Sequence, residues 1–227
     1  MNSSIKINLK SLSKDDLFRF VVDGGLPKYR AGQLIHWMYQ KNAASIDDIT
    51  ELSKDLRNRL GEIAYISNLK LVKRLSSSDG AEKFLFALED EETIESVLIP
   101  EERRLTLCIS SQVGCATGCL FCKTGACGLI RNLKAHEIVD QIIMVNRILS
   151  AQKGDSPSLP IGKEGKGAFF EKKITNIVFM GMGEPLANFD EVVEALWRIT
   201  DFLGLSKRRI TLSTVGIIPK MSLLPLK

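Results

Sequence analysis

The residues with the clearest chemical potential are three cysteines in one short segment, Cys115, Cys119 and Cys122. Thiolates are soft metal ligands, and a set of three protein ligands leaves one metal position open for a small molecule. Phe121 lies inside the motif and would place an apolar wall beside a bound cluster, which would limit its contact with water. The pattern predicts an iron–sulfur cluster with one open iron.

Zinc and disulfide bonds are the alternatives for these thiols. A structural zinc site takes four ligands and usually joins two separated CxxC pairs, and the sequence has no second pair. Structural disulfides have less support, because the total of five cysteines is odd and residues 1–6 lack an apolar signal-peptide core. We therefore expect a reducing, cytoplasmic compartment. Cys127 falls outside the spacing, and packing of a small side chain explains it as well as chemistry does.

Composition sets outer limits on the class of protein. The 227 residues are 44% hydrophobic, which is ordinary for a globular chain, and no apolar run approaches the roughly 20 residues that cross a bilayer, so no membrane partner is expected. The net charge of +4 permits nucleic-acid binding without requiring it. The two histidines, His36 and His136, fall in helical segments as surface or packing residues, so a Ser-His-Asp triad or a histidine-rich metal site has little support.

Residues 1–66 are expected to form a small, all-helical domain. Apolar residues at positions 17, 18, 21 and 22 share one helical face, and a second helical pattern covers 29–41. Ser53 is a plausible N-cap for a third helix, in which apolar residues recur at positions 56, 60 and 64.

A β-rich connector is expected over residues 67–104. Two strand-like runs, 83–88 and 93–99, flank the acidic turn 89–92, which predicts a hairpin.

Residues 105–227 alternate strands with helices, which places the chain in the α/β class. A strand at 105–110 enters the cysteine loop and is followed by a helix at 135–149; the remaining predicted elements are a strand at 174–180, a helix at 189–202 and a strand at 209–213. Such repeats predict a parallel sheet or part of a (βα) barrel that binds ligands at the carboxyl ends of its strands. Residues 150–173, rich in Gly, Ser, Pro and Lys, are expected to be a mobile surface insertion.

Three motifs together carry a family resemblance: residues 108–122, the loop Gly181-Met182-Gly183-Glu184-Pro185, and residues 207–214. In this order they resemble the RlmN/Cfr family of radical S-adenosylmethionine (SAM) RNA methyltransferases, and most of all its RlmN branch, which modifies C2 of adenine. The resemblance implies a partial radical SAM barrel behind a helical RNA-binding-like domain. It also implies a [4Fe–4S] cluster, SAM, 23S rRNA and tRNA as substrates, an electron donor for the cluster, and a monomer.

The resemblance assigns roles to eight residues of this sequence. It makes Cys115, Cys119 and Cys122 the cluster ligands and places Gly183, Glu184 and Ser213 against SAM. It makes Glu95 the proton acceptor and Cys108 the thiol that resolves a covalent protein–RNA adduct. The residues by themselves leave other interpretations open. Glu184 is a plausible cap of the following helix, Glu95 a solvent-facing strand residue, and Cys108 a buried core thiol.

The resemblance implies radical chemistry because C2 of adenine is not nucleophilic enough to attack the methyl sulfonium of SAM. In the family, a deoxyadenosyl radical takes hydrogen from a methyl group held on a protein cysteine, and the carbon radical adds to C2.

The family pattern continues past Lys227 and includes that methyl-carrying cysteine, for which this sequence offers no candidate, since Cys127 is in the wrong place. We therefore expect a C-terminally truncated chain that is inactive in methyl transfer; a catalytically dead cluster- or RNA-binding fragment is the alternative. Basic residues near the expected site could contact phosphates or form a solvated face: Arg103, Arg104, Arg131 and Lys207 to Arg209.

Overall fold

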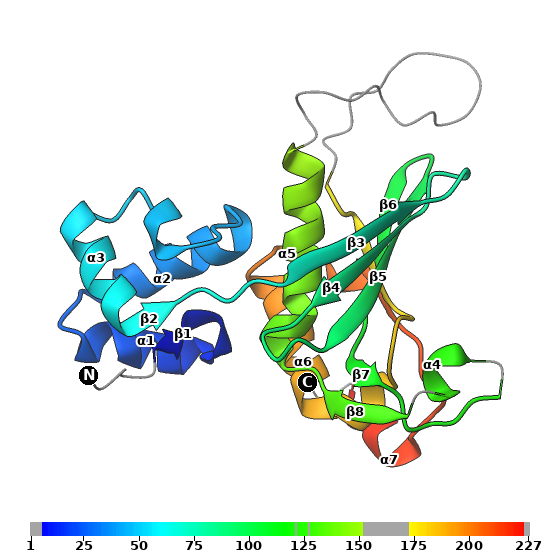
Figure 1. Cartoon of the computed structure of the whole chain (residues 1–227). Coiled ribbons are helices and arrows are strands. Elements are labelled where there is room, and N and C mark those ends of the chain that lie inside the picture. The colour runs from blue at the N-terminus through cyan, green and yellow to red at the C-terminus, as the bar shows by residue number, and fades with distance from the viewer. Residues whose placement is uncertain (1–5, 121, 127, 152–172, 225–227) are drawn as a thin grey trace. The chain divides into compact units, whose positions relative to one another are not determined.

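The computed structural model describes residues 6–120, 122–126, 128–151 and 173–224. The chain divides into two compact units, Met1–Asn68 and Leu69–Lys227 (Figure 1). Most of the expected insertion at 150–173 lies outside the described residues, as do Phe121 and Cys127.

The first unit is built from short helices that bury one face each. Ser13 caps the first of them by accepting a hydrogen bond from the Asp16 amide, and Ser53 caps the third by accepting one from Leu56. All three predicted helices are present, although Val22 is exposed and lies off the buried face. The helices are α1 (Lys14–Asp23), α2 (Tyr29–Ile35) and α3 (Lys54–Ile63), with a π-helical turn η2 (His36–Gln40) and 3₁₀ turns η1 (Leu9–Ser11) and η3 (Ile46–Asp48).

The prediction that this unit is entirely helical is wrong in one respect. Strand β1 (Ile7–Asn8) pairs in parallel with β2 (Ala64–Tyr65). The Asn8 side chain supports the pairing by accepting a hydrogen bond from the Ser67 amide, and the buried Lys10 ammonium donates to the Ser67 carbonyl at 2.8 Å. Strands of two residues are too short to show an alternating pattern in sequence.

The second unit is organised around one six-stranded sheet of order β10-β9-β6-β5-β4-β3. Strands β3 to β6 form an antiparallel meander, whereas β6, β9 and β10 run parallel. The predicted hairpin is confirmed as β4 and β5, and the strands of the expected connector pair directly with the βα part of the chain. The bounds are β3 (Lys70–Ser76), β4 (Glu82–Ala87), β5 (Thr93–Glu101), β6 (Arg104–Cys108), β9 (Asn176–Phe179) and β10 (Ile210–Leu212).

Helices and short elements complete the second unit. The predicted long helices are confirmed as α5 (Ala135–Ala151), which runs alongside the sheet in Figure 1, and α6 (Phe189–Asp201). None of the described helices is long and apolar enough to cross a membrane. The sequence did not predict the hairpin of β7 (Gln112–Gly114) and β8 (Leu129–Asn132), nor the short elements α4 (Lys123–Ala126), η5 (Pro185–Asn188), η6 (Lys207–Arg209) and α7 (Ile218–Met221).

The two faces of the sheet differ in burial. One face is largely apolar and is buried along β4, β5, β6 and β9, and Ser96 on this face contacts Gln141 of α5, so α5 covers it. The opposite face carries Glu95, Val97 and Cys108 in neighbouring strands; Glu95 and Val97 are partly accessible, whereas Cys108 is buried. Burial of the helix-covered face stabilises the sheet that positions the site; its members include Phe84, Phe86, Ile94, Leu98, Leu107, Ile177 and Phe179.

Candidate functional site

The three cysteines of the predicted cluster motif lie on a single loop between β7 and β8. The two strands pair antiparallel, and the Cys115 amide donates to the Gly128 carbonyl at 2.8 Å, which closes the loop at its base. Cys115 is buried, whereas Cys119 and Cys122 are half-buried. Among the residues that the structure describes, no three His, Cys, Asp or Glu side chains are gathered around one metal position. The structure thus brings the thiols onto one loop without arranging them as a closed cage.

The chemistry of this loop nevertheless suits thiolate ligands. Backbone N–H groups of Gly125 and Thr124 lower the pKa of Cys122 from its usual value, since they donate to the charged sulfur. The Thr117 amide donates to the Cys115 sulfur at 3.5 Å. Three sulfur donors on one loop, with backbone N–H groups aimed at two of them, fit an iron–sulfur cluster.

Gly114 stands at the neck of the cysteine loop, where a side chain cannot fit. Its φ is +77°, and a Cβ atom there would lie 2.0 Å from the Gly128 carbonyl oxygen. Gly118 has a similar φ of +64° but open space around it. We expect Gly114→Ala to lower the free energy of unfolding by about 2–4 kcal/mol and Gly118→Ala by about 1 kcal/mol, as measured by urea denaturation. An equal loss of unfolding free energy in the two variants would contradict the close approach of Gly114 to the Gly128 carbonyl.

The loop Gly181 to Pro185 follows β9 and packs against the chain that leaves β6. The Met182 carbonyl accepts hydrogen bonds from the amides of Ser111 and Gln112. Gly183 has a φ of +97°, and a Cβ atom on it would lie 2.5 Å from the Gln112 Cβ. Only glycine therefore fits at position 183, because Gln112 occupies the space that a side chain there would need.

Glu184 joins this loop to the segment after β10. Its carboxylate is buried and accepts hydrogen bonds from the Leu186 amide (2.9 Å), the Thr214 hydroxyl (2.5 Å) and the Val215 amide (2.8 Å), while its own amide donates to the Gln112 side chain. The capping role that the sequence allowed is therefore present, because Leu186 lies in the first turn of η5. Ser213 immediately precedes Thr214 and is exposed. Gly183, Glu184 and Ser213 thus lie on two adjoining loops.

Glu95 and Cys108 lie on the face of the sheet opposite to α5. Cys108 is paired in register with Val97, two residues from Glu95, so the two side chains point to the same side. The Glu95 carboxylate forms an ion pair with Lys83 at 2.9 Å and is 44% exposed, as expected for a strand residue facing solvent. Burial raises the pKa of the Cys108 thiol, which is only 8% exposed. These surroundings agree with the alternative interpretations, in which Glu95 is a solvent-facing strand residue and Cys108 is a buried core thiol.

A buried polar network connects these positions, and the sequence did not predict it. The Ser110 hydroxyl donates to the Glu95 carbonyl at 2.6 Å and accepts from the Met182 amide at 2.9 Å. Gln141 on α5 is fully buried, accepts from the Ser110 amide and the Ser96 hydroxyl, and donates to the Ser110 carbonyl. The sequence feature that could have indicated this network is Gln141, an amide side chain among the apolar residues of α5. A buried polar group needs hydrogen-bond partners.

Arg131 is engaged by carboxylates rather than free to meet phosphates. Its guanidinium forms ion pairs with Asp90 and Glu137. Arg103 and Arg104, in contrast, are exposed, as are Lys207 to Arg209. Of the basic residues that the sequence suggested for RNA contacts, these exposed ones remain candidates.

The Asp90–Arg131 pair gives the fold a dependence on acidic pH. The hydrogen bond from Arg131 is the main cause that lowers the pKa of Asp90 below its ordinary value. The ion pair therefore stabilises the fold fully above the ordinary pKa of an aspartate. This stabilisation is lost as the pH falls through the lower pKa that Asp90 has in the folded chain. Because Asp90 is 46% exposed, we expect a loss of under about 1 kcal/mol. Urea denaturation between pH 6 and pH 3 should show this component in the parent chain and not in Asp90→Asn.

Comparisons with known proteins agree with this arrangement. Residues 7–66 match the family described as the ribosomal RNA large subunit methyltransferase N-terminal domain. The chain is 48% identical over 217 residues to a protein of Geobacter sulfurreducens named dual-specificity RNA methyltransferase RlmN, covering 95% of this chain and 54% of that protein. It is 41% identical over 222 residues to the protein of that name from Buchnera aphidicola, covering 97% and 56%.

A solved structure extends the likeness to the fold. The crystal structure of a radical SAM methyltransferase from Sphaerobacter thermophilus matches with a TM-score of 0.82 and 35% identity, covering 97% of this chain and 60% of that one. The chain spans about half the length of the curated relatives that it matches. Over about half of their length, the chain is therefore similar to proteins named RNA methyltransferase RlmN and to a radical SAM methyltransferase of solved structure.

Proposed function

We propose that this chain carries the cofactor-binding part of an RNA methyltransferase that methylates C2 of adenine by radical SAM chemistry. The observation that supports this most directly is the meeting of three segments at the carboxyl ends of parallel strands. The chain that leaves β6 runs through β7 into the cysteine loop, the Gly181 to Pro185 loop follows β9, and Thr214 and Val215 follow β10 and bond to Glu184. This edge is where α/β sheets and barrels bind their ligands.

The cofactors would be held by the residues of these segments. Cys115, Cys119 and Cys122 would bind a [4Fe–4S] cluster, which when reduced supplies the electron that cleaves SAM. Gly183 would contact SAM through its backbone. The Glu184 carboxylate accepts three hydrogen bonds within the chain, which leaves about one of its four acceptor positions for the SAM ammonium group. Ser213 would complete this contact from the neighbouring loop.

The open sheet face would carry the proton chemistry. Glu95 is exposed enough to reach a base and, paired with Lys83, is placed to take a proton as the carboxylate. Cys108 lies on the same face and would resolve the covalent bond between protein and RNA. Burial disfavours its thiolate, so the thiol form would predominate until the substrate arrives.

The proposed partners follow from this chemistry. Adenines of 23S rRNA and tRNA would be the substrates, bound in the cytoplasm with phosphates near the exposed Arg103, Arg104 and Lys207 to Arg209. A separate reductant would supply the electron to the cluster. We propose that the chain is monomeric.

A second candidate function is a cluster- or RNA-binding fragment without methyl transfer. The observation that favours it is the position of the last cysteine in the sequence, Cys127, which precedes α5 and lies outside the described residues. No cysteine follows it to carry a methyl group.

Anaerobic reconstitution tests both candidates with one preparation. We expect about four irons per chain and release of methionine by one-electron cleavage of SAM when SAM and a reductant are added. With RNA added, we expect no 2-methyladenosine from this chain alone. Absence of iron would contradict the radical SAM proposal, and 2-methyladenosine in the RNA digest would contradict the fragment alternative.

A further inference from the structure

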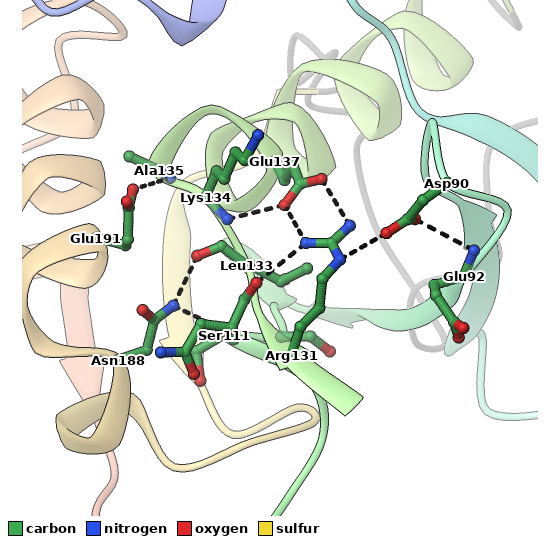
Figure 2. Close-up of polar contacts among 12 residues, drawn as sticks. Asp90, Glu92, Ser111, Arg131, Leu133, Lys134, Ala135, Glu137, Asn188 and Glu191 are labelled. Carbon is green, nitrogen blue, oxygen red and sulfur yellow. Dashed lines mark hydrogen bonds and ion pairs between the residues drawn. The ribbon is translucent and has the colours of Figure 1, made fainter. Parts of the chain in front are cut away.

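Arg131 lies on β8, where the chain leaves the cysteine loop, and its side chain joins three segments (Figure 2). Nη1 and Nη2 bind the two oxygens of Glu137 at 2.8 and 2.9 Å, and Nε binds Asp90 at 2.6 Å. Nη1 also donates to the Asn132 carbonyl at 3.0 Å. The planar guanidinium is therefore used on both of its edges, which a lysine ammonium cannot reproduce.

Both carboxylates are themselves fixed. Glu137 lies in the first turn of α5 and accepts a hydrogen bond from the Lys134 amide at 2.8 Å. Asp90 lies in the turn between β4 and β5 and accepts one from the Glu92 amide at 3.3 Å. Arg131 thus ties the exit of the cysteine loop to the start of a long helix and to the hairpin whose second strand carries Glu95.

The chain that follows β8 is held from the other side. The Asn188 amide group donates to the carbonyls of Ser111 and Leu133, so it bridges the entry and the exit of the cysteine loop. The Ala135 amide donates to Glu191 at 2.6 Å (Figure 2). These contacts hold both stems of the loop against the helix side of the unit.

Apolar burial does not anchor β8. Leu129 and Ile130 are 43% and 60% exposed, and Arg131 is the least exposed residue of the four in this strand. The loop that it ends is also accessible, since Leu120 is fully exposed. Beside the buried Val113 and Leu133, the polar bonds of the stems therefore help to set where the thiols stand.

We infer that Arg131 is a positioning residue, which fixes the cysteine loop relative to Glu184 and the sheet. This inference rests on the proposed function in one respect, that the loop holds a cluster. Loss of a group that is hydrogen-bonded to a metal ligand commonly costs about 10–100-fold in metal affinity. Because Arg131 acts through the backbone of the loop, we expect the lower end, about tenfold faster loss of iron to a chelator.

The test compares Arg131→Met and Arg131→Lys with Arg59→Met, a matched control at an exposed arginine in α3. Each chain is reconstituted anaerobically, and iron loss to a chelator and the electron paramagnetic resonance spectrum of the reduced cluster are measured. Both Arg131 variants should lose iron faster and show a broadened spectrum, while Arg59→Met matches the parent. Hydrogen exchange of residues 129–135 should also rise in the Arg131 variants and not in the control.

The outcomes distinguish failure of the inference about Arg131 from failure of the proposed function on which it rests. If the parent chain binds iron and Arg131→Met keeps the parent's iron retention, spectrum and exchange, the inference is overturned alone. If the parent chain binds no iron, the proposed function fails and the inference fails with it. If Arg131→Met does not fold, Glu137→Gln, which removes one charge and keeps the side-chain shape, takes its place with the same expected direction.

Discussion

Replacement of Cys115, Cys119 or Cys122 by alanine is expected to abolish iron binding by the reconstituted chain. A cluster held by three thiolates and left with two lacks the ligands to stay on the protein, and no histidine or further cysteine among the described residues of the loop can substitute. Iron and sulfide content and the brown charge-transfer absorbance measure the effect. Each of the three variants should lose essentially all of the signal.

Cys108→Ala is the matched control for these variants. Cys108 belongs to β6 and lies in the sheet outside the cysteine loop, so this variant should keep the full iron content. Loss of iron in the Cys108 variant would contradict the assignment of ligands. Zinc in place of iron on the three loop thiols would contradict the cluster itself.

Glu184→Ala is expected to destabilise the chain by about 2–5 kcal/mol. The substitution leaves the amides of Leu186 and Val215 and the Thr214 hydroxyl without their acceptor at a buried position. Glu184→Gln should cost less, because the amide keeps one oxygen acceptor. Urea denaturation measures the loss, and SAM affinity is then compared under conditions where both variants are folded.

Asp190→Ala is the control for the loss of a nearby carboxylate. Asp190 is exposed in the first turn of α6, so its removal should cost under about 1 kcal/mol. A Glu184→Ala chain as stable as the Asp190 variant would show that the carboxylate does not hold the loops together. Weaker SAM binding by folded Glu184→Gln, with little loss of stability, would support its contact with the cosubstrate.

Local patterns in the sequence were sufficient for the long elements. The hairpin β4–β5 followed from two apolar runs around an acidic turn, and α3 followed from Ser53 and a four-residue apolar repeat. These signals are reliable because helices and strands repeat every 3.6 and 2 residues, so burial on one side leaves a readable period. The two-residue strands β1 and β2 are too short to carry such a period.

Long-range contacts were decided only by the folded chain. In sequence, Arg131 was a candidate for phosphate contact or for a solvated charged face, because its charge was visible and its partners were not; Asp90 lies 41 residues away. The sequence allowed two roles for Glu184, a SAM contact and a helix cap. The fold adds hydrogen bonds to Glu184 from Thr214 and Val215, which lie 30 and 31 residues further on. Pairings across such separations depend on how strands are ordered in the sheet, which no local window contains.

The sequence alone determined the chemistry available to this protein, because thiols at a fixed spacing and a glycine-rich loop ending in a glutamate keep their character in any fold. The tertiary structure decided which of these groups meet. Parallel strands β6, β9 and β10 bring the cysteine loop, Glu184 and Thr214 to one edge, and the same packing turns Arg131 inward to two carboxylates. The physical reason is that side-chain identity is fixed by the chain, whereas proximity arises from burying one face of the sheet against α5.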